Sequence, residues 1–122
     1  MAIVDIELVS ATEAEFTRVS AREIADALGA VFGSSPGHTW VRLRRLDGSG
    51  YAENQVDLQD GDHPVFVTVL HAHPPTGPQL EAEAAQVTRS LARCLGRSAQ
   101  RVHVEYAPPG AGRQAFGGRL VL

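Results

Sequence analysis

Two segments of this 122-residue chain share one pattern of apolar residues and glycines, and this repetition restricts the architecture more than any single residue does. Residues 1–46 and 64–107 form two copies of an internal sequence repeat. At a shift of 63 the matched pairs are Ile24 with Val87, Leu28 with Leu91, Phe32 with Leu95, Gly33 with Gly96 and Val41 with Val104. The first strands match at a shift of 62, which sets Val4 against Phe66 and Leu8 against Leu70. Such a repeat predicts two copies of one supersecondary unit, here strand–helix–strand.

Local patterns place the elements of each unit. Alternation or β-branched runs predict strands over residues 2–9, 39–46, 65–71 and 101–106. The first helix is predicted to start at one of two capping boxes, Thr12-x-x-Glu15 or Ser20-x-x-Glu23, and the second to start after Thr76. The expected fold is α+β: a four-stranded mixed sheet with two helices on one face. We expect one domain over 1–122, with a linker at 47–63 and a turn and short strand at 108–122.

Strand alternation also assigns residues to the two faces of the sheet. Val4, Ile6 and Leu8 are predicted to lie under the helices, and the shift of 62 adds Phe66 and Leu70 to them. The same shift puts a second group on the helix-free face: Val65, Val67, Val69, His71 and His73. Alternation in the other strands adds Trp40, Arg42, Arg44, His103 and Glu105 to that face. This mixture of apolar and charged residues predicts an interface between subunits.

Composition excludes several classes of function. A net charge of −3 and a pI near 5.9 argue against a nucleic-acid-binding protein, which would carry a basic patch. The single cysteine, Cys94, cannot form an internal disulfide. The start of the chain has neither a basic region nor a continuous apolar stretch, so we expect no signal peptide, no membrane span and a cytoplasmic location.

The order of several short motifs resembles the tautomerase superfamily. The motifs are Ala2-Ile-Val-Asp-Ile at the start, Phe32-Gly-Ser-Ser-Pro, the strand end Val-Leu-His71 and Arg101-Val-His-Val-Glu-Tyr106. The size is similar to that of macrophage migration inhibitory factor and 5-carboxymethyl-2-hydroxymuconate isomerase. The resemblance implies a homotrimer whose sheets pack by their helix-free faces, acting on a small oxo acid by enol–keto tautomerisation without a cofactor.

The resemblance also implies a catalytic N-terminal proline, and this chain has Ala2 at that position. If Met1 is cleaved, the α-amine of Ala2 can act as a weaker base, since an α-amino group has a pKa near 8. If Met1 stays, the nitrogen of Ala2 is an amide without basicity. The first case predicts weak or altered activity, and the second a non-catalytic trimer that binds a small ligand or serves assembly.

Other site residues follow from matching positions. Arg42 corresponds to an arginine of 4-oxalocrotonate tautomerase and is expected to bind the substrate carboxylate, although pairing with Glu105 or Asp5 across an interface is an equal alternative. His103 and Glu105 correspond to positions that reach a neighbouring subunit's pocket, so they are candidates for general acid/base catalysis. Tyr51 is a further candidate for substrate binding.

The motif His71-Ala-His73 places two imidazoles at a strand end. Alternation would set both on one face, which suits metal ligation, but the sequence fixes no third ligand and we predict no metal site. His73 is instead taken as a candidate for substrate binding. A third interpretation of the whole chain is a monomeric ferredoxin-like domain that senses a small ligand.

Overall fold

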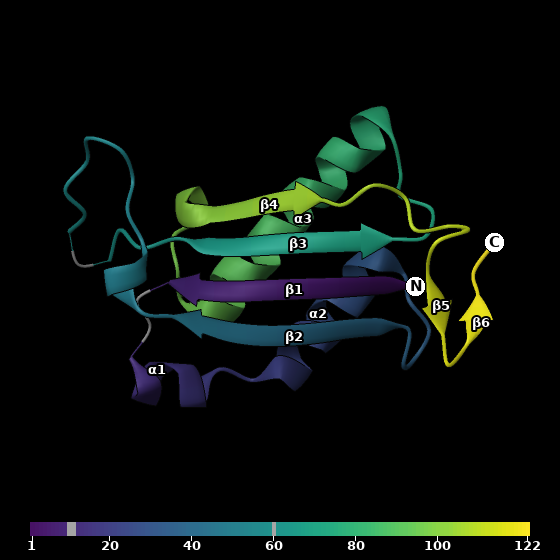
Figure 1. Cartoon of the computed structure of the whole chain (residues 1–122), viewed down its shortest axis with the longest axis horizontal. Coiled ribbons are helices and arrows are strands. Elements are labelled where there is room, and N and C mark those ends of the chain that lie inside the picture. The colour runs from purple at the N-terminus through teal and green to yellow at the C-terminus, as the bar shows by residue number, and fades with distance from the viewer. Residues whose placement is uncertain (10–11, 60) are drawn as a thin grey trace.

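The computed structural model describes residues 1–9, 12–59 and 61–122 (Figure 1). The four strands of the main sheet are β1 (Ala2–Val9), β2 (Thr39–Leu46), β3 (Val65–His71) and β4 (Val102–Tyr106). The α-helices are α1 (Glu13–Arg18), α2 (Ala21–Phe32) and α3 (Gly77–Leu95). Two 3₁₀ turns, η1 (Gly48–Gly50) and η2 (Ala99–Arg101), and a short hairpin of β5 (Ala115–Phe116) and β6 (Arg119–Leu120) complete the described elements.

The sheet is mixed and has the order β2-β1-β3-β4. Each repeat supplies one parallel pair, β1 with β2 and β3 with β4, and the two repeats join where β1 runs antiparallel to β3. Helices α2 and α3 lie together behind the sheet and leave its other face uncovered (Figure 1). The predicted fold class is therefore confirmed.

Both capping boxes are used, so the prediction that the first helix starts at one of them is incomplete. The Thr12 hydroxyl accepts a hydrogen bond from the Glu15 amide at 3.0 Å, and the Ser20 hydroxyl accepts one from the Glu23 amide at 3.1 Å. Between the two helices Val19 has extended backbone angles, φ −73° and ψ 127°, so α1 cannot continue through it into α2. Each box begins its own helix, and α1 has only six residues.

The predicted faces of β3 are wrong. Val4 pairs with Val69, Ile6 with Val67 and Leu8 with Val65, so these three valines lie under the helices and are at most 1% exposed. Phe66 faces the helix-free side and is 38% exposed. Because side chains alternate with a period of two, a one-residue slip in alignment exchanges the faces. A shift of 63, the same as in the helices, places Val4 on Val67 and gives the observed assignment.

The core lies between the sheet and helices α2 and α3. It is built from aliphatic side chains of both repeats, and its buried members are Val4, Ile6, Leu8, Ile24, Leu28, Val65, Val67, Val69, Val87, Leu91, Leu95 and Val102. Val41, Leu43, Val104 and Tyr106 pack against this cluster, as alternation predicts for their strands. Among the described residues, no helix is both long and apolar enough to cross a membrane.

Two glycines of α2 are expected to respond oppositely to the same substitution. Gly33 ends the helix in the left-handed region at φ 66°, so Gly33→Ala should lower the free energy of unfolding by about 1 kcal/mol. Gly29 lies inside the helix, and an added Cβ would meet nothing nearer than the Thr39 hydroxyl at 3.9 Å. Gly29→Ala should therefore raise stability by up to about 1 kcal/mol. Urea denaturation measures both, and equal signs would contradict the assigned cap.

Candidate functional site

The helix-free face of the sheet carries side chains in three rows that cross all or most of the strands. The strand register defines an apolar row of Trp40, Ile3 and Leu70; a middle row of Arg42, Asp5, Thr68 and Glu105; and an outer row of Arg44, Glu7, Phe66 and His103. The apolar row lies at the end of the sheet where β1 begins. The outer row lies toward the opposite end. The charged side chains of the sheet face therefore lie in the middle and outer rows, away from the apolar row.

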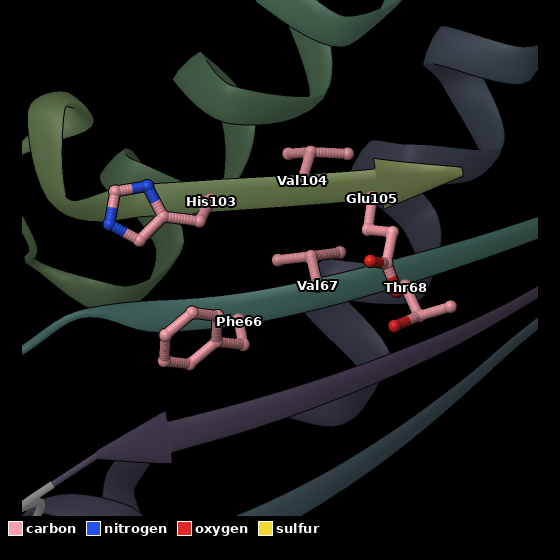
Figure 2. A pocket seen from close by; sticks show the side chains of 6 residues that line it. All are labelled: Phe66, Val67, Thr68, His103, Val104 and Glu105. Atoms are coloured by element: carbon pink, nitrogen blue, oxygen red, sulfur yellow. The ribbon is translucent and has the colours of Figure 1, made fainter. Parts of the chain in front are cut away.

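His103 and Glu105 line one open cavity of about 300 Å³ on β3 and β4. Figure 2 shows the His103 ring beside Phe66, with Glu105 and Thr68 farther along the strands. The rings of Phe66 and His103 have centroids 5.6 Å apart. Both titratable side chains are exposed. An imidazole and a carboxylate at this spacing can exchange protons with a bound molecule.

Residues of the linker join this cavity through the aromatic ring of Phe66. Tyr51 packs against Phe66 with centroids 5.8 Å apart, and its hydroxyl donates to Glu53 Oε2 at 2.6 Å. Arg101 donates to the same oxygen at 2.5 Å. Hydrogen bonds from Tyr51 and Arg101 lower the pKa of Glu53, and the charges of Arg101 and His103 lower it further. Sequence reasoning found Tyr51 but missed Glu53, because the fold of an irregular linker leaves no periodic signal. It also gave no role to Arg101, which lies directly before β4 and meets Glu53 only through tertiary packing.

Arg42 forms an ion pair with Asp5 of its own chain, whereas the alternative that the sequence left open was a pair with Asp5 or Glu105 across an interface. Its Nε donates to Asp5 Oδ1 at 2.6 Å and its Nη2 to Oδ2 at 2.8 Å, a bidentate arrangement. The hydrogen bonds and the charge of Asp5 raise the pKa of Arg42. In the middle row Asp5 and Thr68 separate Arg42 from Glu105, so a single chain does not bring Arg42 to the His103 cavity.

A second cavity of about 470 Å³ lies over the beginning of β2. Trp40 and Phe116 stack there, with centroids 4.4 Å apart and planes inclined by 16°. Ile3, Thr39, Val41 and Arg42 form the rest of the lining. The cavity surface is therefore largely apolar, with the guanidinium of Arg42 at one side. Sequence reasoning missed Phe116, which the β5–β6 hairpin carries to this place.

Ala2 lies at the same end of the sheet and is 1% exposed. Its N–H donates to the carbonyl oxygen of His38 at 3.1 Å. A small cavity of about 270 Å³ adjoins it, lined by Met1, Phe32 and His38 among others. The position that the resemblance assigns to catalysis is therefore next to open space, but the described chain shields the Ala2 side chain itself.

The prediction that His71 and His73 share a strand face with His103 is wrong. His71 lies under the helices, where its Nε2 is 2.9 Å from Glu83 Oε2 on α3. His73 follows the end of β3, is exposed, and its Nε2 is 2.9 Å from the carbonyl oxygen of Leu122. Within the described part of the chain, no three His, Cys, Asp or Glu side chains gather as metal ligands would.

Solved structures share this arrangement over nearly the whole chain. Pt0534 inactivated by 2-oxo-3-pentynoate matches with a TM-score of 0.76 and 19% identity, covering 98% of this chain and 94% of that one. A fused 4-OT, an asymmetric trimer, matches with a TM-score of 0.76 and 16% identity over 97% of this chain and 94% of that one. Macrophage migration inhibitory factor from Oncomelania hupensis matches with a TM-score of 0.73 and 16% identity, over 99% of this chain and 82% of that one. The chain has the tautomerase fold. No protein-family model matches it, and no curated relative does.

Within the tautomerase fold the predicted site residues of one chain fall into two groups at opposite ends of the helix-free face. One group is the His103 cavity with Glu105 and, through Phe66, Tyr51. The other is the Trp40 cavity with Arg42, near the buried Ala2. His73 belongs to neither cavity lining. Each group has only part of the chemistry that the resemblance implies.

Proposed function

We propose that the protein is a homotrimer assembled through the helix-free faces of its sheets. Exposed and half-buried apolar side chains on this face support the proposal: Trp40, Ile3, Leu70 and Phe66. Trp40 was predicted on this face, and Ile3, Leu70 and Phe66 replace the three valines that the sequence had placed beside it. An apolar surface on a sheet face that no helix covers is typical of a subunit contact. The trimeric fused 4-OT, of the same fold, supports the same number of subunits.

In this trimer the two half-sites of neighbouring chains would form one composite site. The His103 cavity of one subunit would meet the Trp40 cavity and Ala2 end of the next. A small oxo acid would bind there, with its carboxylate on Arg42 and its apolar part against Trp40. Tyr51 and His73 are proposed to contact the substrate.

The proposed reaction is keto–enol tautomerisation or a related isomerisation. His103, Glu105 or, once Met1 is removed, the α-amine of Ala2 would take the proton from the enol oxygen and return a proton to carbon, so no oxidant or cofactor enters the balance. The observation that carries the proposal is the open cavity shared by His103 and Glu105. The inactivation of Pt0534 by 2-oxo-3-pentynoate supports a small oxo acid as ligand class.

A second candidate is a trimer that binds a ligand or serves assembly without catalysis. The bidentate pair of Arg42 with Asp5 favours it. A guanidinium that already donates to both oxygens of a carboxylate is less available for a substrate. The replacement of the family's proline by Ala2 favours it as well.

The trimer is tested by substituting the apolar row. Leu70→Glu should convert the trimer into monomers, because three buried carboxylates around one axis cannot be compensated. Light scattering after size exclusion measures the mass. The matched control is Ala85→Glu on the exposed side of α3, which should stay trimeric. Wild-type protein that remains monomeric at every concentration would overturn the proposal.

The acid/base role is tested with phenylenolpyruvate and 2-hydroxymuconate as probes, on which wild-type activity should be weak. His103→Ala should lower kcat/KM by roughly a hundredfold or more, the usual contribution of one proton-transfer group. His63→Ala, which removes a histidine from the linker, is the control and should leave the rate unchanged. Equal rates for wild type and His103→Ala would exclude His103 from the chemistry.

A further inference from the structure

A buried hydrogen-bonded cluster on the helix side of the sheet is used by none of the roles above. One oxygen of Glu83, Oε2, is 2.9 Å from His71 Nε2 and accepts a hydrogen bond from the Tyr106 hydroxyl at 2.7 Å. The His71 and Glu83 side chains are 9% and 13% exposed. The ring of Phe32 meets His71 edge-on, with centroids 4.7 Å apart. Helix α3 is thereby fixed to the ends of β3 and β4 through a single carboxylate.

The strand end that Glu83 holds is the attachment point of two other segments. The Ala72 amide donates to the carbonyl oxygen of Met1 at 3.4 Å. The Gly110 amide donates to the His71 carbonyl at 2.9 Å, and the Ala111 amide to the Ala72 carbonyl at 3.1 Å. The N-terminal residue and the turn after β4 therefore both depend on where residues 71–72 lie.

The turn after β4 leads directly into the β5–β6 hairpin, which contacts the Trp40 cavity. The Gln114 carbonyl accepts from the Val121 amide at 2.8 Å, which closes the base of the β5–β6 hairpin. That hairpin carries Phe116, which stacks on Trp40. Tyr106 immediately precedes the turn, so Glu83 fixes the turn from both sides. Burial and Glu83 raise the pKa of Tyr106, which keeps its hydroxyl a donor.

We propose that Glu83 is a positioning residue that sets the N-terminal end of β1 and the Phe116 hairpin for ligand binding. The inference rests on the proposed function in that these two segments form the Trp40 half of the composite site. It gives the outer helix α3 an influence on a site that lies on the other face of the sheet. Because a buried carboxylate accepts charge-assisted hydrogen bonds, its loss leaves two donors unsatisfied and frees both strand ends.

Native-state hydrogen exchange tests the proposal without any assay of activity. Glu83→Ala should speed exchange of the Ala72, Gly110 and Ala111 amides about tenfold, while the Val67 amide in the middle of β3 keeps its rate. Trp40 is the single tryptophan, so its near-UV circular dichroism reports the stack with Phe116 and should weaken in the same variant. Glu83→Gln keeps an acceptor oxygen and should restore most of both signals.

The matched control is Glu81→Ala, which removes an exposed glutamate two residues earlier in α3 and should change neither signal. If Glu83→Ala does not fold, Tyr106→Phe removes one donor and should speed exchange of the same amides about threefold. Exchange that rises equally throughout the sheet, or an unchanged tryptophan signal, would overturn the positioning role. Local loosening in a protein that proves monomeric or inactive would leave this role standing and reject the proposed function alone.

Discussion

Ala2→Pro, in protein whose first methionine has been removed, is expected to raise tautomerase activity about a hundredfold, which is within the range for a general base. A proline at the first position carries a secondary amine, whereas Ala2 within the chain carries an amide N–H that donates to the His38 carbonyl. With Met1 gone, the free amine would stand beside the cavity that Phe32 and His38 line. Steady-state rates on phenylenolpyruvate measure the effect, and mass spectrometry establishes the first residue.

The control for this result is the same proline variant with one residue left in front of it. Its proline nitrogen is a tertiary amide, which is not basic and cannot donate to His38. We expect no gain in rate and a small loss of stability. If the variant with a free proline amine is no faster than wild type, the composite pocket does not support catalysis and the binding or assembly candidate is favoured.

Arg97→Ala is expected to lower the free energy of unfolding by about 2–4 kcal/mol. The guanidinium is 11% exposed and joins four parts of the chain. It donates to the carbonyl of Val9 at 3.2 Å, to that of His63 at 2.9 Å and to Glu15 on α1 at 3.2 Å. Its removal takes a donor away from each of these acceptors and detaches α1 and the linker from the end of α3. Chemical denaturation monitored by circular dichroism measures the loss.

Two further variants separate the contacts of Arg97 from its charge. Arg93→Ala removes an exposed cation from the last turn of α3, which ends just before Arg97, and should change stability by less than about 0.5 kcal/mol. Arg97→Lys keeps the charge but not the planar fork, so it should recover only part of the loss. A lysine variant as stable as wild type would show that charge alone suffices at this position.

Part of the candidate site could be predicted from the sequence. His103 and Glu105 are two residues apart on one strand, and alternation alone puts them on the same face. The partners of these residues could not be predicted in the same way. Glu53 lies beside the His103 cavity, where it binds Tyr51 and Arg101, and Phe116 lines the Trp40 cavity. The irregular linker and the terminal hairpin that carry these two residues follow paths that depend on long-range packing. Arg42 was assigned two alternatives, and only the register of β1 against β2 selected Asp5.

By itself the sequence determined the four strands, the two long helices and their order, because capping boxes, apolar periodicity and terminal glycines act within a few residues of chain. The repeat also determined the mixed sheet with helices on one face. Tertiary structure alone decided which face of β3 is buried, since that choice follows from pairing with β1 and changes with one residue of register. For the same reason it decided that His71 binds Glu83 beneath the helices while His103 stays open on the opposite face.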